Sequence, residues 1–445
     1  MTAHLLVRIE ACHVAHQEVR GPKKTMQSSS NPRDILDLLS PGMCVFVHAG
    51  ASLPRDFLDA LSAEPERARG VEFVGAFIPG VNTFDFAALA PEVRMVTTFG
   101  GGFHRKSPAR ERIHVLPKGY MSFVRYLADQ TFDLAILHLA PPRADGRLSY
   151  GINQDFVSLA AARSKKLAAF VNRAMPDIDG EPGPQSDDLA LAIDVDTPLP
   201  EYPAGAPSPQ IEAIALHAVT LINDGDTIQI GIGKVQSAIV RALHAHQDIG
   251  VHSGMVDEAI VELAGKGVIT GRRKDFDKET ILTGMVFGTR ATYEFCALPG
   301  VKLRAADYTH APKVLGEITN FVAINSAVEI DLFGQTNAEL VYGGLVSGSG
   351  GFHDFMIGAR LSANGRSIVA LPATGGGVSR IVATLCEPGI VTGLRSDADI
   401  FVTEHGIAKV RDLAQDARAE ALIQIAAPEH RGTLADQWRD MRKRL

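Results

Sequence analysis

The sequence has few cysteines and no long apolar run. Four cysteines (Cys12, Cys44, Cys296 and Cys386) are spread over 445 residues, and none forms a CxxC pair. This spacing argues against a disulfide framework or a zinc ribbon and favours a reducing compartment. We therefore expect a cytoplasmic protein that holds no metal. No run of about 18 uncharged apolar residues occurs, so we also expect no membrane span.

The chain has no excess of positive charge. It contains 44 Lys and Arg against 51 Asp and Glu, a formal net charge of −7, with 46% hydrophobic residues. This is the composition of an ordinary globular protein, and it is too apolar for a disordered chain. It gives no electrostatic reason to expect a nucleic-acid partner. The length suffices for two or three domains.

Residues 1–30 contain no targeting signal that we can identify. The charges of Arg8, Glu10, Glu18 and Arg20 interrupt any apolar core of a secretory signal. A mitochondrial presequence is poor in acids, whereas this segment is not. We expect residues 1–30 to be a loosely held extension, or the product of an upstream start codon. Gln27–Pro32 is predicted to be the linker into the first folded element.

The same series of short apolar segments occurs twice. The matching pairs are Gly42–Gly50 with Gly225–Gly233, Phe132–His138 with Phe321–Asn325, Lys166–Val171 with Ser367–Leu371, and Leu189–Asp194 with Asp399–Glu404. The apolar residues in these runs hardly alternate with polar ones, which is typical of parallel strands buried on both faces. Helical stretches lie between them. We therefore predict an α/β protein with two tandem homologous domains and mainly parallel sheets.

A proline-rich segment separates the two copies. Eight of the 24 prolines lie between Pro176 and Pro209, and such a run indicates loop and linker. We predict an N-terminal domain over residues 31–200 and a C-terminal domain over residues 210–445. Ligands of open α/β sheets bind outside the carboxyl ends of the strands. The predicted active site is therefore a cleft between the two domains.

Two glycine-rich segments are candidate ligand loops. Gly231-Ile232-Gly233-Lys234-Val235 lies between a predicted strand and a predicted helix, a place that favours phosphates or oxyanions. It matches neither a Walker loop nor the dinucleotide fingerprint, so an NAD(P)-binding enzyme is a weak alternative. Ser347–Phe355 contains three glycines, whose amides can form an oxyanion hole for a thioester. HExxH and GxSxG are absent, so a zinc protease or an α/β-hydrolase has no support.

The two-copy plan with these loops resembles the class I CoA-transferases. More narrowly, it is similar to the acetyl-CoA hydrolase / 4-hydroxybutyrate CoA-transferase family. The resemblance covers roughly Gln27 to Leu434. The stretches that carry it are Ala140–Gly151, Gly231–Val235, Asn325–Asp331 with Gly334-Gln335, Ser347–Phe355, Ala363–Ser367, Val378–Val382 and Val402–Ala408.

The resemblance implies a homo-oligomer that moves CoA between an acyl-CoA and a small carboxylic acid. In the family, a glutamate attacks the thioester to give an acyl-glutamyl anhydride, and CoA is then carried as a glutamyl-CoA thioester. Carried over by position, the CoA-binding residues are Gly231, Ile232, Gly233, Lys234, Val235, Val328, Gly351 and Arg366. The Gly351 amide would also act in catalysis as an oxyanion donor, and Arg366 would meet a CoA phosphate.

One position departs from the family pattern. The family glutamate belongs in a segment that reads His-Ser/Thr-Glu-Met, whereas this chain reads His252-Ser253-Gly254-Met255. Gly254 thus takes the catalytic position but has no side chain that could attack a thioester. The covalent route through this residue is closed, and we expect an altered mechanism.

Three functions stay open from the sequence. The first is a CoA-transferase that uses another carboxylate or a direct ternary mechanism. The second is an acyl-CoA hydrolase in which water enters the space that the glutamate left. The third is a catalytically inactive acyl-CoA-binding protein, either a sensor or a partner subunit. The candidate replacement carboxylates are Asp85, Asp257, Glu258, Glu329 and Glu404.

Overall fold

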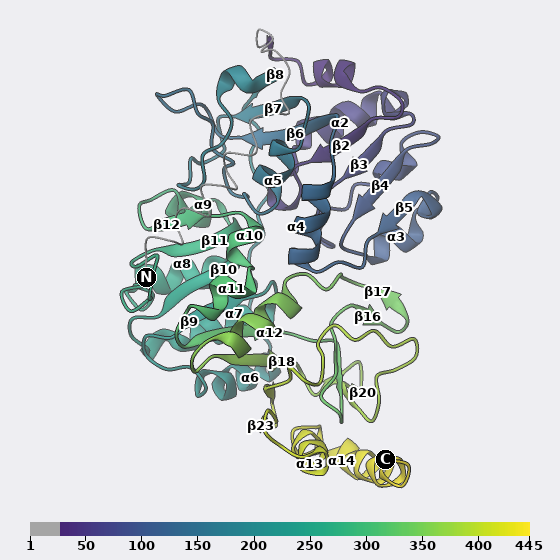
Figure 1. Ribbon diagram of the computed structural model, residues 1–445, viewed down its shortest axis with the longest axis vertical. Helices are drawn as coiled ribbons and strands as arrows, with labels where there is room; N and C mark the ends of the chain where they lie inside the picture. Colours follow the sequence, from purple (N-terminus) through teal and green to yellow (C-terminus); the bar gives the residue numbers. More distant parts are fainter. Residues whose placement is uncertain (1–26) are drawn as a thin grey trace.

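Two eight-stranded sheets, one following the other along the long axis of the molecule, form the framework of the protein (Figure 1). The computed structural model describes residues 27–445, so residues 1–26 of the extension predicted over residues 1–30 lie outside the described residues. The first sheet is built from residues 27–195 and the second from residues 227–409. The prediction of an α/β fold with mainly parallel sheets is confirmed.

All neighbouring strands of the first sheet are parallel, in the order β1-β8-β7-β6-β2-β3-β4-β5. Its strands are β1 (Gln27–Ser29), β2 (Cys44–Val47), β3 (Glu72–Val74), β4 (Arg94–Thr97), β5 (Ile113–Val115), β6 (Leu134–Leu139), β7 (Leu167–Asn172) and β8 (Leu189–Val195). Every residue of β6 and β7 is buried. Burial on both faces explains why these segments show no polar alternation in the sequence.

The second sheet has the order β12-β11-β10-β9-β13-β18-β22-β23, and β23 alone of these eight is antiparallel to its neighbour. Its strands are β9 (Thr227–Ile230), β10 (Gly250–Val256), β11 (Ile281–Val286), β12 (Val301–Leu303), β13 (Phe321–Asn325), β18 (Arg366–Ala370), β22 (Ile400–Thr403) and β23 (Gly406–Lys409). Three smaller sheets follow β13 and β18. They consist of β14 (Glu329–Asp331) with β15 (Thr336–Asn337) and β21 (Ile381–Val382), of β16 (Leu340–Val341) with β17 (Gly344–Leu345), and of β19 (Thr374–Gly375) with β20 (Val378–Ser379).

The repeated sequence segments take equivalent places in the two sheets. Starting from the β5 and β12 edges, β2 corresponds to β9, β6 to β13, β7 to β18 and β8 to β22. The strand beside β2 is β3, and the strand beside β9 is β10. The two halves therefore share one strand order, and the loop after β3 is the counterpart of the end of β10.

One N-terminal expectation differs from the structure. Gln27–Ser29, expected to be part of a linker, forms β1 and pairs in parallel with Leu191–Ile193 of β8. An unpaired edge strand leaves a row of free amides and carbonyls, and β1 covers that edge of the first sheet.

Helices cover the faces of both sheets. In the first half they are α2 (Arg55–Ala63), α3 (Gly102–Lys106), α4 (Tyr120–Asp129) and α5 (Val157–Ala162). In the second half they are α6 (Pro209–Val219), α7 (Lys234–Ala242), α8 (Glu258–Gly265), α9 (Arg290–Cys296), α10 (Ala306–Thr309), α11 (Pro312–Gly316), α12 (Phe352–Leu361), α13 (Gln415–Gln424) and α14 (Pro428–Arg442). The short 3-10 helices are η1 (Pro32–Leu38), η2 (Gly50–Ser52), η3 (Pro65–Ala68), η4 (Phe86–Ala88), η5 (Arg110–Arg112), η6 (Ser186–Asp188) and η7 (Leu243–Ala245). No helix within residues 27–445 combines the length and the apolar character that crossing a membrane requires.

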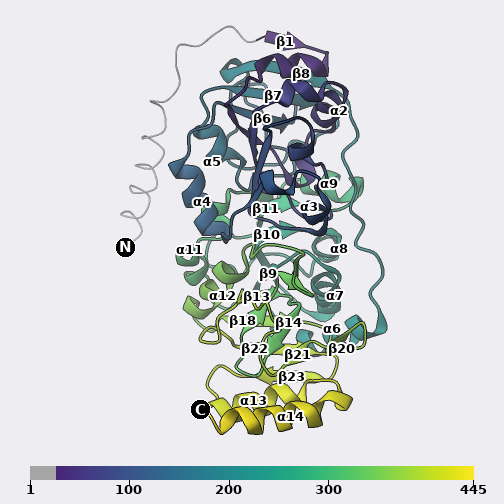
Figure 2. The same cartoon turned by 90° about the vertical axis from the view of Figure 1, so that its right-hand side faces the viewer.

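Backbone hydrogen bonds join the two halves. The amides of Gln154 and Asp155 donate to the Gly284 carbonyl at 2.9 and 3.1 Å, next to the middle of β11. The Val286 amide donates to the Ile152 carbonyl at 2.8 Å. The proline-rich connection from β8 to α6 runs down one side of the molecule instead of through this contact (Figure 2). The second sheet is thus attached to the first half along β11.

Candidate functional site

The candidate site lies where neighbouring strands of the second sheet end. Val251 of β10 pairs with Ile228 of β9, and the strands are parallel, so Gly254 lies level with Gly231. Ile324 of β13 pairs with Ile230 on the other side of β9, which places Asn325 beside Gly231. Three segments that are far apart in the sequence therefore meet at one edge of the sheet, as expected for open α/β sheets.

The loop Gly231–Val235 presents backbone at this edge. Gly233 has φ of +148°, and a Cβ at Gly233 would lie 2.8 Å from Gln236 Oε1, so glycine suits this position. Gly233 precedes α7, whose N-terminus has no side-chain cap. The first amides of α7 are then left for a ligand, and they favour anionic groups. Ile232 and Lys234 are exposed, whereas Val235 is buried.

Asn325 supplies an unused donor next to this loop. Its side chain is 6% exposed, and Nδ2 has no hydrogen-bond partner. Its Oδ1 lies 3.9 Å from the place that a Cβ on Gly231 would take. A buried donor without a partner is costly unless a ligand or water accepts from it. The loop, the uncapped helix and Asn325 therefore fit a ligand rich in acceptor oxygens. Val328 follows at the same end of β13 and is half-buried.

The second glycine-rich loop packs against the first half. The Tyr120 amide donates to the Gly350 carbonyl at 3.1 Å. A Cβ at Gly348 would lie 2.1 Å from the Thr98 carbonyl oxygen, which explains the glycine there. Gly351 follows directly and is the N-cap of α12. The structure thus brings Gly351 to the boundary between the two halves.

His310 fills the space between Gly254 and Gly351. A Cβ on Gly254 would lie 2.6 Å from His310 Cε1 and 2.7 Å from Nε2, and a Cβ on Gly351 would lie 2.4 Å from Cδ2 and 2.7 Å from Nε2. The imidazole is 2% exposed and lies between the rings of Tyr120 and Phe355, with centroid distances of 3.9 and 4.5 Å. Sequence analysis missed His310, because a lone histidine after a short helix carries no motif.

Asp155 is a second residue of the site that the sequence did not indicate. Its carboxyl is hydrogen-bonded to the Tyr120 hydroxyl, and its Oδ1 has no partner. Oδ1 lies beside Gly284, which in turn adjoins the Gly254 carbonyl. Burial raises the pKa of Asp155 to about 8 and the pKa of Tyr120 well above 10. Burial also lowers the pKa of His310 well below 6.5. Asp155, Tyr120 and His310 are therefore mainly uncharged at neutral pH.

Two of the five candidate carboxylates are helix caps. Asp257 accepts from the Ala259 and Ile260 amides at 3.0 and 3.2 Å and from the Ser237 hydroxyl. Asp85 accepts from the Ala88 amide at 3.1 Å at the start of η4. These contacts stabilise helix N-termini, which is a sufficient reason for an acid at each position.

The three candidate glutamates also have structural partners. Glu258 accepts from the Ala204 amide at 3.0 Å and so holds the linker. Glu329 accepts from Asn337 Nδ2 at 3.1 Å and from the Cys386 amide at 3.2 Å. Glu404 accepts from the Ala373 amide at 2.9 Å and from Gln210 Nε2. Among residues 27–445, no group of three or more His, Cys, Asp or Glu side chains is placed to hold a metal ion.

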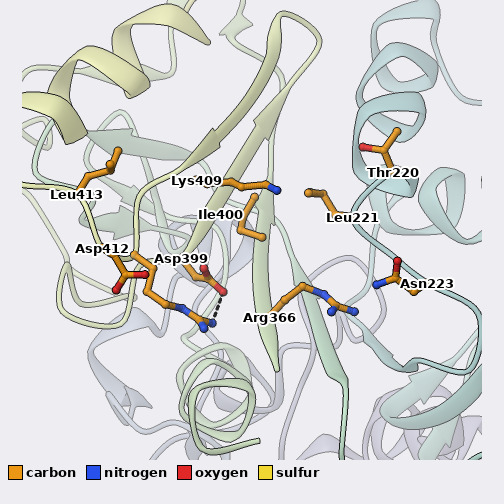
Figure 3. A pocket seen from close by; sticks show the side chains of 10 residues that line it. Thr220, Leu221, Asn223, Arg366, Asp399, Ile400, Lys409, Asp412 and Leu413 are labelled. Carbon is orange, nitrogen blue, oxygen red and sulfur yellow. Dashed lines mark hydrogen bonds and ion pairs between the residues drawn. The ribbon is translucent and has the colours of Figure 1, made fainter. Parts of the chain in front are cut away.

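The structure does not bring Arg366 together with the Gly231–Val235 loop. Arg366 is the first residue of β18 and pairs in register with Val322, so it lies toward the amino ends of the strands. Its guanidinium forms an ion pair with Asp226, which is 2% exposed. Arg366 lines a pocket of about 510 Å³ together with Lys409 and Asn223, at the edge opposite Gly254 (Figure 3).

The chain resembles known proteins over nearly its whole length. It is 31% identical over 400 residues to the 4-hydroxybutyrate coenzyme A transferase of Clostridium kluyveri. The alignment covers 89% of this chain and 93% of that protein. The chain belongs to the acetyl-CoA hydrolase/transferase family. The C-terminal domain of that family matches residues 288–438, and the relatives include CoA-transferases and acetyl-CoA hydrolases.

Solved structures agree with this assignment. RipA from Yersinia pestis aligns with a TM-score of 0.87 and 26% identity over 94% of this chain and 98% of that one. The 4-hydroxybutyrate CoA-transferase of Porphyromonas gingivalis aligns with a TM-score of 0.78 and 29% identity over the same shares. The predicted family is confirmed, and the names of the sequence relatives refer to CoA transfer and to the hydrolysis of acetyl-CoA. The individual site residues stay predictions.

We predict that Arg366→Leu acts on stability rather than on CoA binding. The substitution removes the cation of this ion pair and leaves the buried Asp226 carboxylate with only the Asn223 amide as a partner. This loss costs about 3–5 kcal/mol of the free energy of unfolding. Urea denaturation measures this loss, and calorimetric titration with CoA measures affinity. A weaker affinity for CoA with an unchanged free energy of unfolding would contradict this assignment and favour a phosphate contact.

We also predict that Asp155 makes stability fall as the pH rises. The carboxyl holds its proton up to about pH 8 in the folded protein, whereas the unfolded chain releases it near pH 4. The unfolded state therefore gains stability relative to the folded state between these pH values. Asp155→Asn should remove this loss and stabilise the protein at pH 8 by on the order of a few kcal/mol, with little effect at pH 4. Urea denaturation at both pH values checks this. Equal effects at pH 4 and pH 8 would show that Asp155 is not protonated when folded.

Proposed function

We propose that this protein is a CoA-transferase that moves CoA from an acyl-CoA to a small carboxylic acid without a glutamate at position 254. The observation that supports this most is the near full-length similarity to a CoA-transferase, combined with the meeting of Gly231–Val235, Asn325, Gly254 and Gly351 at one edge of the sheet. In this proposal, CoA lies along the Gly231–Val235 loop. The thioester lies at the boundary between the two halves, beside Gly351, and the Gly351 amide stabilises the developing oxyanion.

The surroundings of the thioester suit a reaction from which bulk water is excluded. Tyr120, Asp155 and His310 are all buried, and burial shifts the pKa of each toward its uncharged form. A desolvated pocket strengthens the interaction between an oxyanion and a backbone amide. It also limits hydrolysis of a reactive acyl group, which a transferase must avoid. Homo-oligomer formation and cytoplasmic location stay predictions.

Product analysis by mass spectrometry tests this function. The purified protein is incubated with acetyl-, butyryl- or succinyl-CoA, each with and without a panel of small carboxylic acids. We expect new acyl-CoA species that depend on the acid. Free CoA in the absence of any acid would indicate the hydrolase instead. No product, together with a CoA-dependent rise in melting temperature, would indicate a binding protein without turnover.

A pair of variants tests whether position 254 belongs to the nucleophile. Gly254→Glu alone should lower the melting temperature and give no transfer through the introduced carboxylate, because a Cβ at this position would lie 2.6 Å from His310 Cε1. Gly254→Glu combined with His310→Gly frees this space. We expect the double variant to form a covalent enzyme–CoA thioester, which intact mass spectrometry detects after incubation with acyl-CoA. A single variant that forms this adduct as readily as the double variant would contradict the steric argument.

A further inference from the structure

The imidazole of His310 occupies the space of two missing side chains. Its Nε2 atom is 2.7 Å from the place of a Cβ on Gly254 and 2.7 Å from the place of a Cβ on Gly351. Such distances are too short for real Cβ atoms, so a side chain at either position would require His310 to move. The two glycines therefore bring the backbone of β10 and of the second loop close to one nitrogen atom.

The Thr309 hydroxyl lies close to His310 Nδ1. Its oxygen is 2.8 Å from Nδ1, a contact in which either group can be the donor, and it lies 3.4 Å from the Ala305 carbonyl oxygen. A nucleophilic Nε2 requires the tautomer in which Nδ1 donates to the hydroxyl oxygen. In that tautomer Nε2 carries a free electron pair next to Gly254 and Gly351.

The surrounding rings hold this nitrogen in place and keep it uncharged. Tyr120 stacks on one face of the imidazole, with an angle of 29° between the rings, and Phe355 packs against it at 42°. Tyr120 is itself held by the hydrogen bond of its amide to the Gly350 carbonyl and that of its hydroxyl to Asp155. Burial lowers the pKa of His310 well below 6.5, with a further contribution from His252. A neutral, oriented imidazole is the nucleophilic form.

We propose that His310 Nε2 is the nucleophile of this enzyme, in place of a carboxylate at position 254. The inference rests on the proposed function and names the group that attacks the thioester. The electron pair of Nε2 adds to the acyl carbon, the carbon–sulfur bond breaks, and CoA leaves as its thiolate. The N-acyl imidazole keeps its Nδ1 proton and is therefore cationic until the acceptor attacks. The acceptor carboxylate attacks the acyl carbon, frees the imidazole and forms a mixed anhydride. The CoA thiolate finally attacks the acceptor carbonyl and releases the donor acid.

This route differs from a carboxylate route in where CoA is during the reaction. An N-acyl imidazole carries the acyl group, so CoA never becomes attached to the protein. CoA must remain bound while the acceptor acid reacts, and the acceptor therefore binds before the donor acid leaves. A route through a glutamyl-CoA thioester instead releases the donor acid first, which gives ping-pong kinetics.

Initial-rate kinetics of the wild-type protein are the first test, because they need no substitution. Acyl-CoA and acceptor acid are varied together, and the double-reciprocal plots should intersect. Brief incubation with acyl-CoA alone should add the mass of the acyl group to the protein, and peptide mapping should locate it at His310. Parallel plots, or an adduct with the mass of CoA, would overturn the proposal.

Removal and replacement of the imidazole is the second test. His310→Gly should lower kcat by at least about 100-fold, and added imidazole should restore a substantial part of it by entering the vacated space. His114→Ala at the exposed position of strand β5 removes a histidine far from the site and is the matched control for the reaction of free imidazole with thioesters. Rescue of H310G beyond that control supports the nucleophile. Full activity of H310G without imidazole would overturn it.

Folding and function are checked separately. His310→Gln retains most of the side-chain volume and should also lose activity while keeping the wild-type melting temperature. If H310Q keeps the wild-type kcat, His310 has only a packing role and the inference fails, although the proposed function stands. If the wild-type protein itself turns over no acyl-CoA, the proposed function fails, and the role of His310 fails with it.

Discussion

The contact of Gln154 and Asp155 with the Gly284 carbonyl is the constraint on which the site depends. Gly284 lies in β11, next to Gly254 in β10, so these two hydrogen bonds place the first half directly over the end of β10. They place Asp155 Oδ1 beside Gly284, which adjoins the Gly254 carbonyl. Tyr120 lies close by because its hydroxyl is hydrogen-bonded to Asp155. Backbone hydrogen bonds between the two halves are well suited to positioning site residues, because their geometry does not depend on side-chain rotamers.

The second property of the site is that Asp155, Tyr120 and His310 are buried in their uncharged forms. Asp155, Tyr120 and His310 would each be costly to bury as ions, and burial shifts the pKa of each toward its uncharged form. A carboxylate at position 254 would have to share this space with the rings of His310 and Phe355. The ring of His310 therefore occupies the space that a side chain at position 254 would need, and glycine at that position leaves this space free. Each of the acids expected from the sequence already accepts hydrogen bonds from the backbone or from a side chain.

The two ends of the second sheet have different roles. The carboxyl ends present Gly231, Gly254 and Asn325, with the uncapped α7 and an unpaired amide donor. The amino ends present Arg366, which forms an ion pair with Asp226. An arginine at a matched position in the sequence therefore does not by itself identify a phosphate contact, because the same guanidinium can neutralise a buried acid.

The sequence by itself determined the α/β class, the duplication and the family. Buried parallel strands appear as unalternated apolar runs such as those of β6 and β13, and the glycine loops are local patterns of contiguous residues, so both can be recognised without a fold. The limits of the predicted domains and the oligomeric state stay predictions. Only the tertiary structure decided which residues surround Gly254. His310, Tyr120 and Asp155 come from three separate segments, and their positions follow from strand register and from the docking of one sheet on the other. No local pattern records such distances, because they arise between residues that are far apart in the chain.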